Sequence, residues 1–141
     1  MAKKAFFVRA LNTSHSFYSI NIKWLPLEKL FSKCDIIVVC CTKNKASQEL
    51  IGANVLEKFS HGSILISISH RDVFDNSALL STLKKRCDIR AWIDFDLRKD
   101  DERFLGLPNV HFSPHLAFYT EQTLTKRIDS CIDQLEEFFV F

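Results

Sequence analysis

The stretch Gly62-Ser-Ile-Leu-Ile-Ser-Ile-Ser-His70 follows the turn residues Ser60 and His61 and ends in the polar pair His70-Arg71. A continuous apolar run bounded by turn residues predicts a strand covered on both faces, as in a parallel sheet. In such sheets ligands bind outside the carboxyl ends of the strands. His70 and Arg71 are therefore placed where chemistry is expected. The alternative is that they only cap a strand at the surface.

Strands and helices alternate along the rest of the chain. We predict strands at Lys4–Leu11, Ile20–Trp24, Asp35–Cys41, Ile89–Phe95 and Val110–Phe112. We predict helices at Leu27–Phe31, around residues 50–59, after a cap at Asp75 or Asn76, and from about Thr120 to Phe139. Strands that alternate with helices of about 10–15 residues indicate βαβ units and a parallel sheet. We expect one α/β domain over residues 1–141.

Composition excludes several classes of function. A chain of 141 residues fits one domain that buries about two-thirds of its unfolded surface. A net charge of +2 indicates neither a nucleic-acid-binding surface nor a membrane-surface patch. The three glycines exclude a glycine-rich phosphate loop within this sequence.

Cysteines and histidines give no sign of a metal site. The five cysteines contain no C-x-x-C pair, so we expect reduced thiols in a cytoplasmic protein. The spacing of His111 and His115 occurs in zinc sites, but Pro114 breaks any helix there and no cysteine pair accompanies it. No apolar segment approaches the roughly 20 residues that span a bilayer, and Arg9 interrupts the N-terminal apolar run, which argues against a signal peptide.

A series of short motifs resembles one family in order and spacing. The motifs are Asp35-Ile-Ile-Val-Val39, Leu50-Ile-Gly-Ala53, Leu56–Phe59, Gly62-Ser-Ile-Leu-Ile66, Asp75-x-x-Ala-Leu-Leu80, Asp94, Leu107-Pro-Asn-Val110 and Ser113-Pro-His115. Together they resemble the NAD-binding domain of the D-isomer-specific 2-hydroxyacid dehydrogenases, from about residue 4 to residue 139. The combination is the specific signal, above all L-P-N-V followed by S-P-H.

The resemblance implies a Rossmann-like parallel sheet with helices on both faces, NAD as cofactor, and pairing with a substrate domain. It implies that His115 is the general acid/base and that Asp94 lies near the nicotinamide carboxamide. It places His70 where the family has the arginine that binds the substrate carboxylate. The cofactor-binding positions it implies are Cys41, Thr42, Ile68, Ser69, His70, Asp94 and His115.

This sequence also departs from the family pattern. Arg71 follows the family arginine position by one residue, and such a slip turns a strand side chain to the opposite face. The family glutamate that tunes the histidine falls on Leu97, or on Asp96 if one residue is deleted. The family's first strand and its G-x-G-x-x-G turn would precede Lys4, so we expect a fold without that strand.

We favour a truncated member of the family that is non-catalytic on its own and acts through protein contacts. The alternative is one part of an NAD-dependent 2-hydroxyacid oxidoreductase whose missing half another chain supplies. A third interpretation is an unrelated flavodoxin-like binding module. Without the family's first strand, the strands at Lys4–Leu11 and Asp35–Cys41 either pair directly or each leave an unpaired edge. We also expect a homodimer or a partner chain, because an unpaired apolar edge such as Ile36–Val39 recruits another chain and because the chain ends in Phe138-Phe-Val-Phe141.

Overall fold

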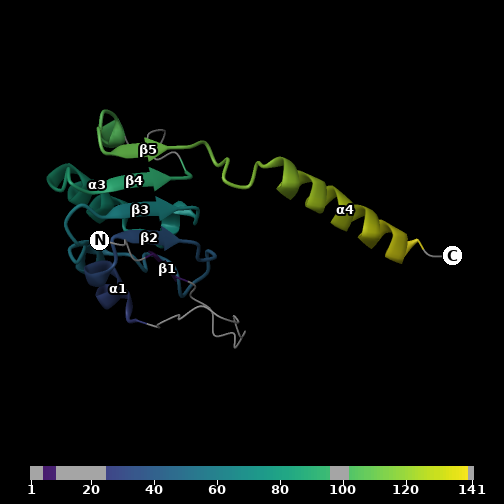
Figure 1. Cartoon of the computed structure of the whole chain (residues 1–141), viewed down its shortest axis with the longest axis horizontal. Helices are drawn as coiled ribbons and strands as arrows, with labels where there is room; N and C mark the ends of the chain where they lie inside the picture. The colour runs from purple at the N-terminus through teal and green to yellow at the C-terminus, as the bar shows by residue number, and fades with distance from the viewer. Residues whose placement is uncertain (1–4, 9–24, 96–101, 140–141) are drawn as a thin grey trace.

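A parallel sheet forms the centre of the computed structural model, which describes residues 5–8, 25–95 and 102–139 (Figure 1). Its five strands lie in the order in which they follow one another along the chain. They are β1 (Ala5–Val8), β2 (Ile36–Val39), β3 (Ile64–Ser67), β4 (Arg90–Ile93) and β5 (Val110–Phe112). The α/β class and the parallel sheet are confirmed. The predicted strand at Ile20–Trp24 lies outside the described residues.

Three of the four helices begin and end close to where the sequence predicts them. They are α1 (Leu27–Lys33), α2 (Ala53–Leu56), α3 (Asn76–Lys85) and α4 (Glu121–Phe138), with 3-10 turns η1 (Arg71–Val73) and η3 (Glu102–Phe104). Asp75 caps α3, since its carboxylate accepts from the backbone N–H of Ser77 and of Ala78, at 3.0 Å each. None of the described helices is both long enough and apolar enough to cross a membrane.

Helix α2 is shorter than its apolar pattern predicts. Ile51, which we assigned to the helix, instead makes a parallel bridge with Phe74. The N–H of Ile51 donates to Val73 at 3.0 Å, and the N–H of Asp75 donates to Ile51 at 3.2 Å. The apolar side chain is buried by this extended contact, so its burial does not require a helix.

The two faces of the sheet differ in how far their side chains are buried. One face carries buried Ile37, Leu65 and Ile93, which join a single core with residues from all three preceding helices, namely Leu30, Phe31, Val55, Leu56, Leu79, Leu80 and Leu83. On the other face Ile36, Val38, Ile64 and Ile66 are only half-buried, and Trp92 is exposed beside His111. We expected helices on both faces. Among the described residues, the three helices that contribute to the core all pack on the same face of the sheet.

Strand β1 pairs directly with β2, in the register Ala5–Ile36 to Val8–Val39. Strand β2 pairs with β3 on its other side. Of the two arrangements expected without the family's first strand, the structure shows the direct pairing of these strands, and Ile36–Val39 has no unpaired edge. That reason for association is removed, because both sides of β2 already carry the backbone hydrogen bonds of a ladder.

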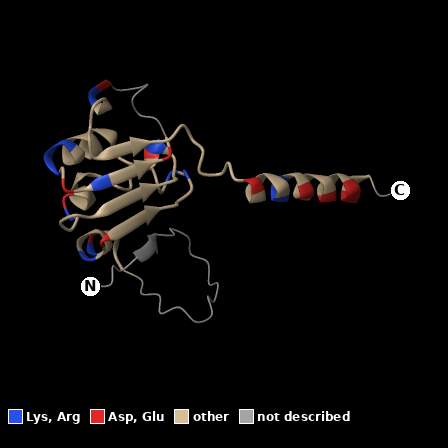
Figure 2. Ribbon diagram, turned by 45° about the horizontal axis from the view of Figure 1, so that its top comes forward, with Lys and Arg blue, Asp and Glu red and all other residues tan. Residues whose placement is uncertain are grey.

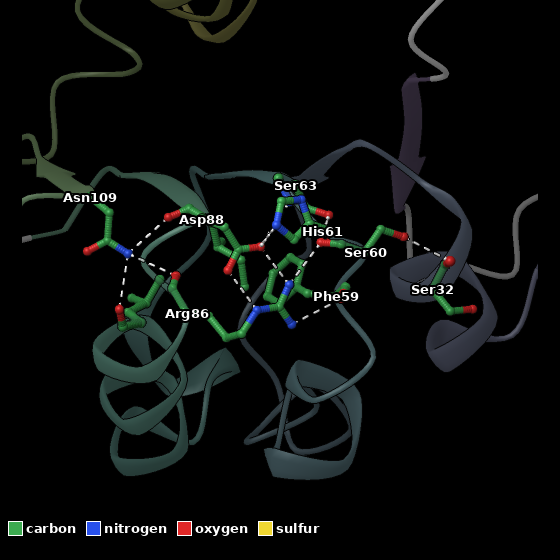
Figure 3. Close-up of polar contacts among 11 residues, drawn as sticks. Ser32, Phe59, Ser60, His61, Ser63, Arg86, Asp88 and Asn109 are labelled. Atoms are coloured by element: carbon green, nitrogen blue, oxygen red, sulfur yellow. Dashed lines mark hydrogen bonds and ion pairs between the residues drawn. The ribbon is translucent and has the colours of Figure 1, made fainter.

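A network of polar contacts joins the amino-terminal ends of the strands (Figure 3). The side-chain N–H groups of Asn109 donate to the carbonyls of Leu83, Arg86 and Ile89, at 3.0, 3.3 and 2.9 Å. Arg86 makes two hydrogen bonds to Asp88, both at 2.8 Å, and these lower the pKa of the Asp88 carboxyl well below its usual range. This network gives the asparagine of the L-P-N-V motif a structural role, as a cap on the end of α3.

Helix α4 extends away from the sheet (Figure 1). Thr120 caps it by accepting from the N–H of Thr123 at 3.2 Å. None of its residues is buried. The predicted amphipathic helix is confirmed, but its apolar face packs on no part of the described domain.

Candidate functional site

The predicted site residues lie where strands β4 and β5 end. Asp94 follows β4 directly, and the turn Ser113-Pro-His115 follows β5. The N–H of Ser113 donates to the carbonyl of Ile93 at 3.0 Å, which continues the pairing of the two strands. The S-P-H turn is therefore fixed beside Asp94 at the carboxyl edge of the sheet, where parallel α/β folds bind ligands.

The Asp94 carboxylate organises this turn. It accepts a very short hydrogen bond from the Ser113 hydroxyl. It also accepts from the backbone N–H groups of Leu116 at 2.8 Å and of Ala117 at 2.9 Å. Burial raises the pKa of Asp94, but these three hydrogen bonds and the nearby His115 outweigh it and hold the pKa below its ordinary value. Asp94 is thus a buried carboxylate whose two oxygens are both engaged within the chain.

His115 lies beside Asp94 but is open to solvent. Its Nδ1 is 3.3 Å from the Asp94 carbonyl oxygen and 3.9 Å from the carboxylate Oδ2. Its side chain is 73% exposed, and its ring contacts Phe118 at 5.5 Å between centroids. The backbone of His115 has φ +58°, a left-handed conformation that is uncommon for residues other than glycine. Such outliers often occur at functional sites, where surrounding contacts hold them in place.

His70 is held by the backbone of Asp72. Its Nδ1 accepts from the Asp72 N–H at 3.2 Å and lies 3.6 Å from Asp72 Oδ1. Arg71 and Lys43 also make ion pairs with Asp72. The hydrogen bond from Lys43 is the main cause of a lowered Asp72 pKa, and the charges of His70 and Arg71 add to it. Arg71 and Lys43 thus form a half-exposed ion-pair cluster around the Asp72 carboxylate, and His70 is hydrogen-bonded to the Asp72 backbone, in the turn that follows β3.

The remaining predicted cofactor-binding residues lie at the ends of β2 and β3. The Ser69 hydroxyl donates to the sulfur of Cys41 at 3.6 Å, and both side chains are buried. Thr42 is exposed, and its carbonyl accepts from the Ser47 hydroxyl at 2.7 Å. Ile68 is 49% exposed, although its N–H is paired to Val39. A buried pair and two exposed neighbours therefore line this part of the edge.

The structure joins some of the predicted residues and not others. Asp94 meets His115 and Cys41 meets Ser69, whereas no hydrogen bond or ion pair within the described residues joins His70 to His115. Sequence reasoning gave no role to Ser113, although the S-P-H motif contains it, and it missed the contacts of Asp72 and Lys43, which no motif signals. Asp96 and Leu97 lie outside the described residues. The catalytic and binding roles of all these residues stay predictions.

The residues at this edge fit one end of a dinucleotide better than the other. The exposed imidazole of His115 offers a polar group that a nicotinamide ring or a small carboxylate could contact, whereas the oxygens of Asp94 are already engaged by Ser113 and by the turn. A pyrophosphate needs close backbone approach at adjacent glycines and a helix N-terminus. The chain's glycines are Gly52, Gly62 and Gly106, which lie far apart in the sequence and form no such loop. Within the described residues, no group of three His, Cys, Asp or Glu side chains could hold a metal ion.

Comparison with known proteins relates this arrangement to one family. The family model for the "D-isomer specific 2-hydroxyacid dehydrogenase, NAD binding domain" matches residues 2–117. Among curated relatives, an aromatic 2-oxoacid reductase of Clostridium sporogenes is 26% identical over 133 residues, which cover 83% of this chain and 40% of that protein. A 2-ketogluconate reductase of Gluconobacter oxydans is 27% identical over 115 residues, which cover 80% of this chain and 37% of the relative.

Solved structures agree on the fold. An acyclic imino acid reductase in complex with NADPH and D-Arg matches with a TM-score of 0.81 at 24% identity, over 96% of this chain and 43% of that one. A D-2-hydroxyisocaproate dehydrogenase matches with a TM-score of 0.77 at 21% identity, over 94% and 44% of the two chains.

This chain spans about 40% of the length of the curated relatives. The cofactor expectation is confirmed at the level of the family, whose domain is described as NAD-binding. The match over residues 2–117, on a Rossmann-like parallel sheet, shows that the chain belongs to the NAD-binding domain family of the D-isomer specific 2-hydroxyacid dehydrogenases.

Proposed function

We propose that this chain is a nicotinamide-side domain of the 2-hydroxyacid dehydrogenase type that does not transfer hydride on its own and acts through contacts with other protein. One observation carries the proposal: the candidate groups at the carboxyl edge are engaged with one another rather than arranged around a substrate. Asp94 is saturated by Ser113 and by the backbone of the S-P-H turn. His70 contacts Asp72, and no hydrogen bond or ion pair within the described residues joins it to His115.

Solvent exposure of His115 supports the same proposal. A general acid/base works best where water is excluded, because electrostatic interactions strengthen and side reactions are suppressed. The His115 side chain is 73% exposed. The arginine clamp that would orient a substrate carboxylate is replaced by His70, and Arg71 already pairs with Asp72. Loss of such a bidentate clamp removes positioning that is worth several orders of magnitude in rate.

A second candidate function is one half of a 2-hydroxyacid oxidoreductase whose other half comes from another chain. The observation that favours it is the exposed apolar surface beside His115, formed by Leu116, Phe118 and Tyr119. A covering domain that packed there would exclude water from His115 and could supply the missing carboxylate clamp. We place either form of the protein in the cytoplasm, which suits its five free cysteines.

A hydride-transfer assay tests the proposal. We expect the isolated chain to show no oxidation of NADH with pyruvate, 2-oxoglutarate or hydroxypyruvate above the rate of a His115→Ala variant. Turnover by the unmodified chain that His115→Ala abolishes would overturn the proposal. Turnover that appears only after the substrate domain of a relative is added, and again depends on His115, would favour the second candidate.

A further inference from the structure

Arg127, in the second turn of α4, lies against the ring of Phe118. Its guanidinium carbon is 5.6 Å from the ring centroid, which is a cation–π contact. The basic residues of α4 are Lys126 and Arg127, near its start, where Figure 2 shows the helix in blue. Among the described residues, no carboxylate pairs with Arg127. A guanidinium that stacks by its face leaves the N–H groups at its edge free to bind an anion.

The imidazole of His115 contacts the same phenyl ring. The two ring centroids are 5.5 Å apart. Nδ1 of His115 lies 3.3 Å from the carbonyl oxygen of Asp94, which can only accept, so Nδ1 carries the proton of this contact. Nε2 has no partner among the described residues. Phe118 thus brings together two nitrogen groups from different segments, a guanidinium on α4 and an imidazole in the S-P-H turn.

Exposed apolar side chains adjoin these two groups. The ring of Tyr119 meets that of Phe118 edge to face, with centroids 5.8 Å apart, and Leu116 precedes them in the chain. Tyr119 is 63% exposed and Leu116 is 51% exposed. An inorganic anion would leave this apolar surface in water. A ligand that joins an anionic group to an aromatic ring would engage both parts, because aromatic rings pack favourably against one another.

We propose that Arg127, His115 and Phe118 form a binding site for a small aromatic carboxylate. The guanidinium binds the carboxylate through paired hydrogen bonds, and the ring of the ligand packs on the exposed aromatic surface beside it. Arg127 comes from α4, whereas the family arginine position is occupied by His70 after β3. The binding needs neither NAD nor a 2-oxo group on the ligand, so it is independent of whether the chain transfers hydride.

The open position of the cluster limits the affinity. Small-molecule sites are usually concave and bury most of the ligand, whereas the His115 side chain is 73% exposed. For a ligand of about ten non-hydrogen atoms, we expect a dissociation constant of roughly 1 mM.

Titration of the isotope-labelled chain with phenylacetate, followed by proton–nitrogen NMR spectra, tests the proposal. We expect saturable shifts in the amide signals of residues 115–119 and in the Nε–H signal of Arg127. Arg127→Gln should weaken binding about tenfold or more, the effect of one hydrogen bond between charged groups. Lys126→Gln is the matched control, because it removes the same charge about 100° round the helix, and it should leave the affinity unchanged.

Arg127→Lys separates charge from geometry. Lysine keeps the positive charge but has neither the planar fork nor the stacking face, so its binding should fall between that of the parent and that of Arg127→Gln. No saturable shift at about 10 mM phenylacetate, ten times the expected dissociation constant, would overturn the proposal. So would an equal loss of affinity in Arg127→Gln and Lys126→Gln.

Related ligands show which chemical groups the site recognises. Phenylacetamide has the shape of phenylacetate without its charge, and acetate lacks the ring, so both should bind about tenfold more weakly or worse. Phenylpyruvate adds a 2-oxo group and should bind about as well as phenylacetate. Equal binding of phenylacetamide would overturn the proposal. Binding of phenylpyruvate without binding of phenylacetate would also overturn it, because the site would then recognise the 2-oxo acid of a hydride-transfer reaction.

Discussion

Replacing Asp94 with alanine should loosen the turn that carries His115. The carboxylate accepts from Ser113, Leu116 and Ala117, and its side chain is only 7% exposed. A hydrogen bond to a charged group contributes about 1.5–3 kcal/mol net. Leu116 and Ala117 are exposed, so water can satisfy their freed N–H groups and only part of three such contributions is lost. We expect Asp94→Ala to lower the free energy of unfolding by about 2–3 kcal/mol.

Urea unfolding followed by circular dichroism measures this change. Asp94→Asn keeps an acceptor oxygen but turns a donor toward one N–H, so its loss should be about half as large. Asp133→Ala on α4 removes an exposed carboxylate and serves as the control, with an expected change within about 0.5 kcal/mol. A loss below about 0.5 kcal/mol for Asp94→Ala would refute the reasoning, because the S-P-H turn would then not depend on the carboxylate.

Three further predictions concern stability. Asn109→Asp should destabilise the fold more than Asn109→Ala in urea unfolding, because a carboxylate would face the carbonyls of Leu83, Arg86 and Ile89. Equal losses of unfolding free energy in the two variants would contradict the capping role of Asn109. Asp75→Ala should cost about 1 kcal/mol in the same assay, the value of an N-cap, and no change would mean that α3 does not need it. The pKa values of Asp88 and Asp94 are lowered in the folded state, so their contribution is fully present above the unfolded value of about 4 and is lost as pH falls toward the folded values. Stability measured from pH 5 downward should therefore decline less steeply in Asp94→Asn than in the parent, and parallel curves would show that Asp94 does not contribute.

Local sequence signals predicted the elements that depend on neighbouring residues. The cap at Asp75 and the strand at Val110–Phe112 were found because a capping side chain and a short apolar run act within a few residues. The length of α2 was not predicted correctly, because Ile51 pairs with Phe74 instead of joining the helix. Pairing between residues that are distant in the sequence leaves no periodic signal.

In the candidate site, too, local signals were predicted and contacts that depend on the folded chain were not. The sequence predicted the strands that Asp94 and His115 follow, and because these strands are adjacent in the parallel sheet, the two residues lie beside each other. The position of His70 at a strand end was also predicted, but its contact with Asp72 was not, since the chain turns back after β3. Amphipathic spacing predicted α4, yet it gives no information on what covers the apolar face.

The central claim is that this chain has the fold of an NAD-binding domain but lacks the glycine turn that would hold the pyrophosphate. Calorimetric titration with NADH and with NAD tests it most directly. We expect no saturable heat for either nucleotide at the micromolar concentrations at which cofactors ordinarily bind to dehydrogenases. Saturable binding of NADH in that range, weakened by Asp94→Ala, would contradict the account.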